Sequence, residues 1–244
     1  MHRFGLIGKN ISYSFSKTYF AEKFKNEDIK NCSYDNFDLS HISQFPKAIK
    51  ETEGLRGLNV TIPYKEAIIP YLDKIKKHAK KIGAVNTIKI SKKGKLIGYN
   101  TDYYGFKKSL EPYLKPYHKK ALILGTGGAA KGIAYALELL DIELIFVSRS
   151  PKKVNEINYT DLTKKVMKKY SIIVNCTPKG TFPNISQCPN IPYDHLTSEH
   201  ILYDLIYNPE ETEFLKRGRE HGAVTCNGLR MLHLQAERSW DIWN

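Results

Sequence analysis

Three polar side chains of different chemistry surround the end of one apolar segment, in the sequence "NVTIPYKEAI". Asn59 carries an amide, Thr61 a hydroxyl and Lys65 an ammonium group. Amides and hydroxyls both donate and accept hydrogen bonds. A lysine in such a site can give a proton to a reacting oxygen and take it back. On its own, Lys65 also fits a surface lysine in a short helix after Pro63, so other residues must join it before a site is indicated.

A glycine-rich segment in the second half of the chain has the spacing of a dinucleotide-binding loop. In "LILGTGGAAKGIAYAL", Gly125, Gly127 and Ala130 match the pattern G-x-G-x-x-G/A between a strand-like run and a helical run. Glycines let the backbone turn tightly and approach a pyrophosphate, and the start of the helix offers free N–H groups to the anion. Glycines also occur in ordinary turns, but the strand–loop–helix context predicts a dinucleotide.

The end of the next strand indicates which dinucleotide binds. An NAD site usually has an acidic residue there to hold the ribose 2′-hydroxyl. Here the sequence is "FVSRSPKKV", which has Ser148, Arg149 and Ser150 but no carboxylate, followed by Lys152 and Lys153. Arginine can hold a phosphate with a fork of donors, so we predict NADP(H) in preference to NAD(H). The two lysines also fit the surface charge of the whole chain, and Arg149 is the stronger signal.

Further polar residues lie in short clusters elsewhere: Ser14 and Ser16 in "SYSFS", Asn86 in "GAVNTI", Asn100, Thr101 and Asp102 in "GYNTD", and Gln235 in the last helical segment. Each also has a structural interpretation. A serine can cap a helix, Asn86 can satisfy a turn, Asp102 can be the N-cap of the helix that follows it, and Gln235 can be exposed.

The elements that must position these groups alternate between strands and helices. Strand-like runs at 3–8 and 57–62 precede helical patterns near 16–24 and 74–82, and "SKKGK" predicts a hairpin between 84–90 and 95–100. After a helical segment at 102–114 the pattern restarts, with strands predicted at 120–125, 143–148, 171–176 and 201–207. We therefore expect an α/β fold of two domains with a cleft between them, over residues 1–103 and 104–225. A last helix within 226–244 is expected to pack back on the first domain, although its sequence fits either.

Composition places the chain among globular proteins. It has 244 residues, 41% of them hydrophobic and 26% charged. No run approaches the roughly 18 apolar residues of a membrane helix, and "MHRFGLIGKN" is not a secretory signal, so we expect a cytoplasmic protein without a membrane partner. The net charge is +13, but the lysines are scattered in pairs along helix faces, which argues against a nucleic-acid partner.

The cysteines and histidines give no sign of a metal site. No C-x-x-C pair and no H-E-x-x-H sequence occurs among the four cysteines and eight histidines. We expect no metal and no disulfide, and structural thiols at Cys32, Cys176, Cys188 and Cys226.

Taken in order along the chain, these motifs resemble those of the shikimate dehydrogenases. The segments that carry the resemblance are "SYSFS", "NVTIPYKE", "GAVNTI", "GYNTDYYGF", "GTGGAAKG", "VNCTPKGT", "YDLIYNPEETEFL" and "NGLRMLHLQA". The resemblance covers residues 5–240. Its most specific parts are N-V-T-x-P-x-K, G-A-V-N-T and N-T-D found together.

The resemblance implies an oxidoreductase with NADP(H) as its cofactor. The reaction would be the reversible, NADPH-dependent reduction of 3-dehydroshikimate to shikimate, in aromatic amino-acid biosynthesis. Residues 1–103 would form the substrate-binding and catalytic domain, and 104–225 the Rossmann-type parallel-sheet domain that binds NADP. The partners would be small molecules, shikimate or 3-dehydroshikimate, and the protein a monomer or a homodimer.

The resemblance also assigns roles residue by residue. Lys65 and Asp102 match the catalytic pair of the family. The positions that match substrate-binding residues are Ser14, Ser16, Thr61, Asn86, Tyr207 and Gln235. The pyrophosphate loop is matched by Gly125, Thr126, Gly127, Gly128 and Ala129, the 2′-phosphate loop by Ser148, Arg149, Ser150, Lys152 and Lys153, and the nicotinamide side by Leu205 and Gly228.

The residue types suit this chemistry. Two serine hydroxyls can meet the two oxygens of the shikimate carboxylate. In the implied reaction, hydride would reach the ketone carbon and Lys65 would supply the proton to the ketone oxygen as a general acid. We expect Asp102 to orient the ammonium group and a substrate hydroxyl rather than to act as the main acid, and Asn59 to have a supporting role.

The chain departs from the family pattern at several positions. Tyr13 and Lys17 replace His and Pro, "SRS" replaces "NRT", and Arg230 and His233 replace small residues on the last helix. Three alternatives remain: a quinate/shikimate dehydrogenase using NAD, which would favour an acid near Ser148; a catalytically silent NADP-binding regulatory protein, which would lack Lys65 or Asp102; and a basic nucleic-acid binder, which would concentrate its charge on one face.

Overall fold

The computed structural model describes residues 1–12 and 14–244, so Tyr13 lies outside it. The chain divides into two compact units, Met1–Thr101 with Ala236–Asn244 and Asp102–Gln235. The boundary near the end of the chain falls within the helix α8 (Leu229–Trp243), between Gln235 and Ala236. Among the described residues, no helix combines the length and apolar character needed to cross a membrane.

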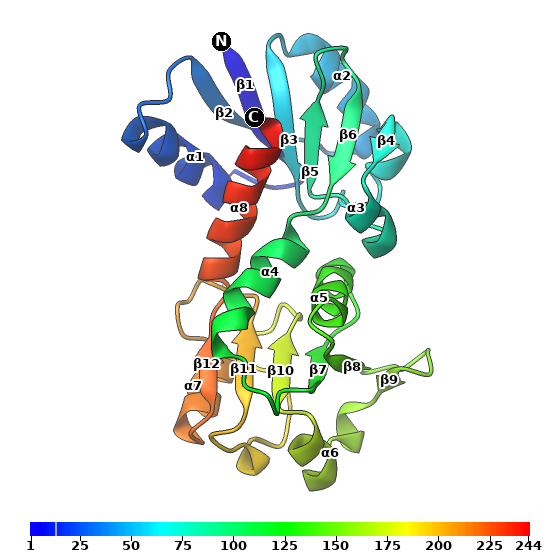
Figure 1. The fold of residues 1–244 in the computed structure, drawn as a ribbon, viewed down its shortest axis with the longest axis vertical. Helices are drawn as coiled ribbons and strands as arrows, with labels where there is room; N and C mark the ends of the chain where they lie inside the picture. The colour runs from blue at the N-terminus through cyan, green and yellow to red at the C-terminus, as the bar shows by residue number, and fades with distance from the viewer. Residues whose placement is uncertain (13) are drawn as a thin grey trace. The chain divides into compact units, whose positions relative to one another are not determined.

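The first unit contains a mixed six-stranded sheet (Figure 1). Its strands in spatial order are β2 (Cys32–Asp38), β1 (His2–Gly8), β3 (Leu55–Val60), β5 (Thr87–Ile90), β6 (Leu96–Tyr99) and β4 (Lys74–Ile75). The strands β2, β1 and β3 are parallel, whereas β5 runs antiparallel to both β3 and β6. The antiparallel pair of β5 and β6 confirms the predicted hairpin.

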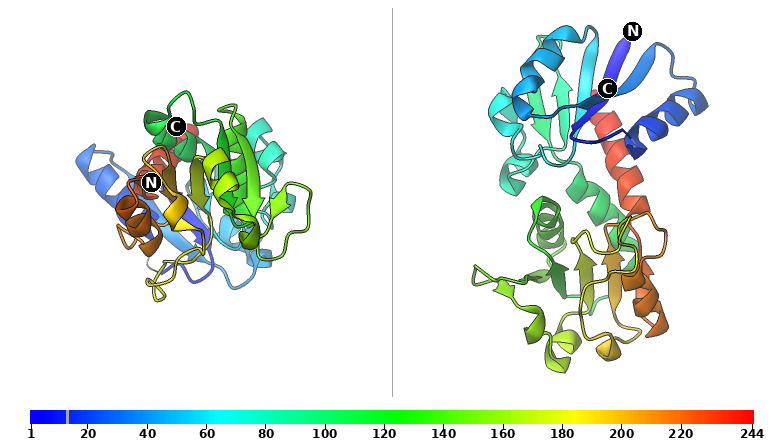
Figure 2. Two further views of the ribbon diagram at one scale, coloured as in Figure 1. Left: turned by 90° about the horizontal axis from the view of Figure 1, so that it is seen from below. Right: turned by 180° about the vertical axis from the view of Figure 1, so that it is seen from behind.

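Helices cover both faces of this sheet (Figures 1 and 2). The helix α1 (Phe15–Asn26) and the end of α8 share one core, in which Phe4, Phe20 and Trp243 are buried. The helices α2 (Phe45–Glu51) and α3 (Lys77–Ile82) share the core of the opposite face, with Ile7. Successive side chains of a strand point to opposite faces, so Leu6 and Ile7 of β1 enter different cores.

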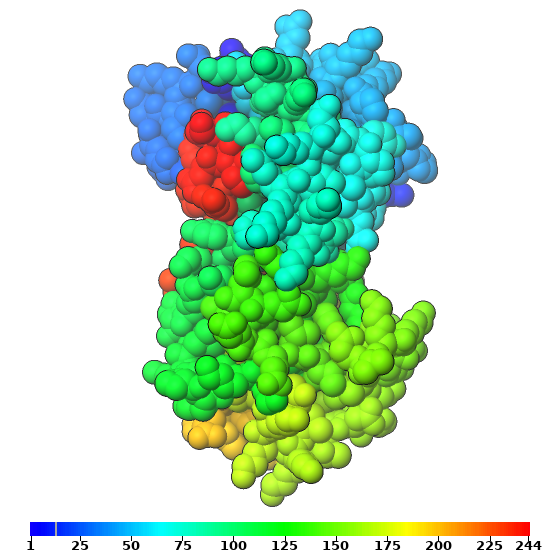
Figure 3. Space-filling model, turned by 45° about the vertical axis from the view of Figure 1, so that its right-hand side comes forward, coloured from blue at the N-terminus to red at the C-terminus, as the bar shows by residue number. Residues whose placement is uncertain are grey.

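The last turns of α8 approach the sheet closely. The Trp243 indole lies over Gly57, where a Cβ atom would overlap the ring, and its Nε1 donates to the Ile88 carbonyl at 2.9 Å. In the space-filling view the end of the chain (red) reaches the surface beside the blue segment that contains α1 (Figure 3). The first unit therefore includes the end of α8 in its core.

The second unit contains a parallel six-stranded sheet. Its spatial order is β12 (Val224–Cys226), β11 (Ile201–Asp204), β10 (Ile172–Asn175), β7 (Lys120–Leu124), β8 (Glu143–Val147) and β9 (Glu156–Ile157). The chain order reverses between β7 and β10, as in a Rossmann-type sheet, and such sheets bind ligands beyond the carboxyl ends of the strands at this point. The predicted α/β class with a parallel cofactor-type sheet is confirmed.

Both faces of this sheet are buried, which explains its continuous apolar strands. The helices α4 (Asp102–Leu110) and α5 (Gly128–Glu138) cover one face, where Phe106 and Ile133 are buried. The helices α6 (Lys164–Lys169) and α7 (Glu213–Glu220) cover the other, with Met167 and Phe214.

Two predicted helices differ from the structure. The segment after Pro63 forms successive turns that end in the 3₁₀ helix η2 (Ile69–Tyr71), in which Pro70 has no N–H to extend a helical ladder. The helix predicted over 74–82 begins only at Lys77, because Lys74 and Ile75 pair with β6 as the strand β4. The strand predicted over 201–207 ends at Asp204.

Candidate active site

A cavity of about 740 Å³ lies in the second unit, at the carboxyl ends of its central strands. Its walls combine the glycine loop after β7, the end of β8 and the loop after β10. The lining residues are Gly125, Thr126, Gly127, Val147, Ser148, Arg149, Asn158, Tyr159, Cys176, Thr177, Pro178, Lys179, Gln187 and Asn190.

The glycine loop has the backbone conformation that its sequence predicts. Gly125 has φ = 101°, which a side chain would strain, and a Cβ atom there would lie 3.2 Å from Thr177 Cγ2. Gly127 is the N-cap of α5, and Gly128 and Ala129 begin that helix. The first N–H groups of α5 have no partner within the helix and suit an anion.

The segment after β8 brings Ser148 and Arg149 to the cavity wall. The Asn158 side chain donates to the Arg149 carbonyl at 3.2 Å, and the Ser148 hydroxyl accepts from the Ser150 N–H at 3.2 Å. None of the described residues that line the cavity is acidic. Ser150, Lys152 and Lys153 belong to the same exposed loop but do not line the cavity. Their contact with a 2′-phosphate stays a prediction.

Leu205 and Gly228, predicted to lie on the nicotinamide side, are in contact. The Gly228 N–H donates to the Ile206 carbonyl at 3.0 Å, and a Cβ atom on Gly228 would overlap the Leu205 carbonyl. Only glycine allows this approach of the two loops. Tyr207 is 38% exposed, and partial burial raises the pKa of its hydroxyl.

The first unit holds a network of buried amides and hydroxyls. Tyr34 Oη donates to Asn59 Oδ1 at 2.8 Å, and Asn59 Nδ2 donates to Ser239 Oγ at 2.9 Å. Ser239 is also 2.8 Å from the Thr87 hydroxyl and 3.2 Å from that of Thr101. Asn59 thus joins β3 to β2 and α8, which fits the supporting role predicted for it.

Asn86 belongs to the same network and is 3% exposed. Its Oδ1 accepts from the Thr101 N–H at 2.7 Å, and its Nδ2 donates to Thr101 Oγ1 at 3.0 Å. These bonds fix the backbone immediately before Asp102. A contact between Asn86 and a substrate stays a prediction.

The other polar residues of the first unit lie on loops held by its sheet. Ser14 is the N-cap of α1 and accepts from the Ser16 N–H at 3.2 Å, and the Ser16 side chain adjoins the Tyr34 hydroxyl. The Thr61 N–H donates to the Ile7 carbonyl at 2.8 Å. Lys65 is half-buried, and its carbonyl accepts from the Val85 N–H at 2.8 Å.

Asp102 and Gln235 belong to the second unit by their contacts. Asp102 is the first residue of α4, where its carboxylate interacts favourably with the partial positive charge of the helix N-terminus. Gln235 is buried against Gly105 of α4, and its Nε2 donates to the Leu232 carbonyl at 2.9 Å. The four cysteines are free thiols, and no cluster of potential metal ligands occurs within residues 1–12 and 14–244.

Comparison with known proteins gives consistent results. Residues 6–88 match the family model of the shikimate dehydrogenase substrate binding domain. A shikimate dehydrogenase (NADP(+)) from Clostridium botulinum is 42% identical, over 100% of this chain and 96% of its own. The chain belongs to the shikimate dehydrogenase family.

Solved structures of other family members agree. Shikimate dehydrogenase 1 from Peptoclostridium difficile is 42% identical with a TM-score of 0.85, covering 100% of this chain and 91% of its own. A shikimate 5-dehydrogenase from Thermus thermophilus, in complex with NADP(H) and shikimate, is 30% identical with a TM-score of 0.88, covering 100% and 94%.

In this member of the family, several residues that shape the site were not predicted. Tyr34, Thr87 and Ser239 complete the network of the first unit, and Asn158, Tyr159 and Lys179 line the cavity of the second. The only signal for Ser239 is its position four residues after Gln235, on the same helix face. Nothing local in the sequence marks Tyr34.

Proposed function

We propose that this protein catalyses the reversible, NADPH-dependent reduction of 3-dehydroshikimate to shikimate. The observation that carries this conclusion is the cavity of the second unit, in which the glycine loop and Arg149 meet without an acidic residue. It occurs in a chain that is 42% identical over its full length to a shikimate dehydrogenase (NADP(+)).

The cavity supports binding of NADP(H). The first N–H groups of α5 and the glycine loop suit the pyrophosphate, and Arg149 and Ser148 suit the ribose 2′-phosphate. Because the Arg149 carbonyl is held by Asn158, the start of this loop has a defined path. An acidic side chain in the cavity would repel a 2′-phosphate, and none of the described lining residues is acidic.

The polar loops of the first unit support binding of shikimate. Ser14 and Ser16 share the first turn of α1 and present two hydroxyls to a carboxylate. Thr61 and Asn86 add hydroxyl and amide groups for the ring hydroxyls, and Tyr207 and Gln235 complete the proposed substrate set. The network behind Asn86 fixes the orientation of its amide.

NADPH, when bound, supplies the hydride that the ketone carbon accepts. Lys65 donates the proton to the ketone oxygen and accepts it again in the oxidation direction. Asp102 accepts hydrogen bonds and so orients the Lys65 ammonium group and a substrate hydroxyl. Leu205 and Gly228 hold the backbone on the nicotinamide side.

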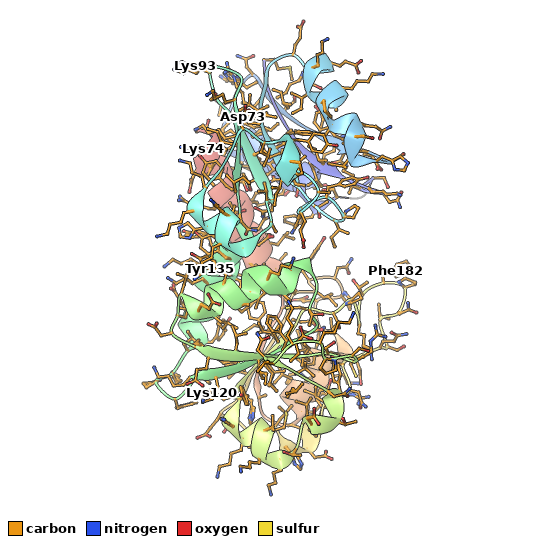
Figure 4. The ribbon with its side chains drawn as sticks, turned by 90° about the vertical axis from the view of Figure 1, so that its right-hand side faces the viewer. Asp73, Lys74, Lys93, Lys120, Tyr135 and Phe182 are labelled. Atoms are coloured by element: carbon orange, nitrogen blue, oxygen red, sulfur yellow. The ribbon has the colours of Figure 1, made fainter. Side chains whose placement is uncertain are left out.

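The test is the NADP+-linked oxidation of shikimate, followed by the absorbance of NADPH. Lys65→Ala should lower kcat about 100-fold, because general acid–base catalysis is lost. The matched control is Lys93→Ala, since Lys93 is exposed in the turn between β5 and β6 (Figure 4) and should leave kcat unchanged.

Two results would contradict the proposal. One is a wild-type protein that oxidises quinate with NAD+ in preference to shikimate with NADP+. The other is a Lys65→Ala variant as active as Lys93→Ala, because the ammonium group would then have no part in the reaction.

A further inference from the structure

Asp204 is a fully buried carboxylate at the carboxyl end of β11. Its Oδ1 accepts hydrogen bonds from the Ile206 N–H at 3.0 Å and from Asn175 Nδ2 at 3.1 Å. Its Oδ2 accepts from the Thr212 hydroxyl at 2.7 Å. Burying a carboxylate costs free energy. Its position beside the proposed cofactor cavity therefore suggests a function at that cavity.

The hydrogen bonds continue from Asp204 to the cavity wall. Asn175 Oδ1 accepts from both the Thr177 hydroxyl, at 2.7 Å, and the Thr177 N–H, at 3.0 Å. Thr177 lines the cavity, and its methyl group adjoins Gly125 of the glycine loop. One relay of two side chains therefore joins Asp204 to the loop that is to hold the pyrophosphate.

The charge on Asp204 favours one direction of this relay, as does the Lys179 carbonyl, which accepts from Asn175 Nδ2 at 3.4 Å. An ionised carboxylate only accepts hydrogen bonds, so it requires Asn175 to turn its Nδ2 towards Asp204. The Asn175 Oδ1 then faces Thr177 and accepts both of its donors. A neutral group at 204 would also accommodate the reversed amide, which offers Thr177 no acceptor.

We propose that Asp204 is a positioning residue for cofactor binding, which acts through Asn175 and Thr177 on the shape of the NADP(H) cavity. This rests on the proposed function, because it takes that cavity to be the cofactor site. The same carboxylate holds the loop after β11 through Ile206, and that loop contains Leu205 and Tyr207.

Few ionisable groups face Asp204. Burial raises the pKa of the Cys176 thiol, which follows β10, and the nearby Asp204 charge raises that pKa further. The hydrogen-bond partners from β10, the loop after β11 and the N-cap of α7 are all neutral. Burial raises the pKa of Asp204 to about 6, so the ionised form predominates at neutral pH.

The test is titration calorimetry of NADP+ binding to wild type and Asp204→Asn. At pH 8 the variant should bind NADP+ about tenfold more weakly, as expected for a lost charge-assisted hydrogen bond. A fall in the folded fraction alone would change neither the dissociation constant of NADP+ nor the KM for shikimate. Asp194→Asn is the matched control, because its side chain is 95% exposed and away from the cavity.

Measuring NADP+ binding by both proteins over a pH series distinguishes a positioning role of the Asp204 charge from a general loss of affinity in the variant. Protonation of Asp204 should weaken wild-type binding below pH 6, so the tenfold gap at pH 8 should shrink to about twofold at pH 5. The 2′-phosphate of NADP+ titrates in both proteins and cancels from this ratio. A gap that stays constant with pH would overturn the proposed role of the charge.

The remaining outcomes are also decisive. If wild type does not bind NADP+, the proposed function fails; if wild type and Asp204→Asn bind it equally, only the positioning role fails. If Asp204→Asn does not fold, Thr177→Val decides, because it removes the hydroxyl donor of the relay and leaves only the Thr177 N–H. Weaker NADP+ binding by Thr177→Val supports the relay, and unchanged binding overturns it.

Discussion

The buried network of the first unit is neutral, whereas that of the second contains an ionisable carboxylate. In the first unit, Asn59, Thr87 and Ser239 join strands and helix through amides and hydroxyls. In the second, Asn175 and Thr212 converge on Asp204. Both networks hold residues that are proposed to contact ligands. The charge of the two networks, however, responds differently to pH.

The difference follows from the acidity of their members. Burial raises the pKa of the Tyr34 hydroxyl above its ordinary value of 10.0, so the network of the first unit keeps its protons throughout the physiological range. Burial raises the pKa of Asp204 to about 6, so the network of the second unit changes its charge near neutral pH. Substrate contacts should therefore tolerate acid better than cofactor contacts.

The largest effect is expected at Asn59. Replacing Asn59 by Ala removes one hydrogen-bond partner from the Tyr34 hydroxyl and one from the Ser239 hydroxyl, and it opens a cavity. Together these losses should lower the free energy of unfolding of the first unit by about 4 kcal/mol. Tryptophan fluorescence during urea denaturation measures this unit selectively, since Trp240 and Trp243 are the two tryptophans of the chain and both belong to it.

Asn26→Ala is the matched control, because Asn26 is exposed at the end of α1. Its midpoint should equal that of wild type. A similar midpoint for Asn59→Ala would mean that the buried amide adds nothing to the stability of the first unit.

The second-largest effect is expected in the pH dependence of the free energy of unfolding. The pKa of the Asp204 carboxyl is 3.8 in the unfolded reference and about 6 in the folded chain, so between these values the folded chain binds the proton more tightly. The proton on Asp204 therefore contributes on the order of 3 kcal/mol to the free energy of unfolding. This contribution is fully present below pH 4 and is lost as the pH rises through 6.

Urea denaturation at pH 4.5 and pH 7, followed by circular dichroism, compares wild type with Asp204→Asn. The wild type should lose more stability than the variant as the pH rises, because other groups titrate alike in both. Equal losses would show that Asp204 titrates as an ordinary exposed carboxyl, and the contrast between the units would disappear.

The smallest effect is expected at Ser239. Ser239→Ala removes one hydroxyl, but Asn59 Nδ2 keeps the Asn86 carbonyl and the Thr87 hydroxyl as acceptors. The first unit should lose about 1 kcal/mol by the same fluorescence measurement, with no change in NADP+ affinity. A loss as large as that of Asn59→Ala would place Ser239, rather than Asn59, at the centre of the network.

The parts of the molecule that the sequence predicts are those encoded by neighbouring residues. The glycine spacing of residues 125–130 predicts a strand–loop–helix unit, and a turn motif predicts the β5–β6 hairpin, because each needs only a short stretch of chain. The networks join residues far apart in the chain: Asn59 meets Tyr34 across 25 positions and Ser239 across 180. No local pattern reports such contacts.

Short strands were missed for a related reason. The strands β4 and β9 have 2 residues each, too few for an alternation of polar and apolar side chains to be recognised. Their pairing with β6 and β8 depends on sheets that other segments build. The path of the loop after β8, with Asn158 bonded to Arg149, likewise appears only in three dimensions.

The position of Trp243 over Gly57 has a consequence for folding during protein synthesis. Domains usually fold in the order in which the ribosome makes them. Here the core of the first unit includes Ala236 and Trp243, which are translated after every residue of the second unit. The nascent chain therefore has a complete sequence for the cofactor unit first, and the earlier-made sheet must wait for its covering helix.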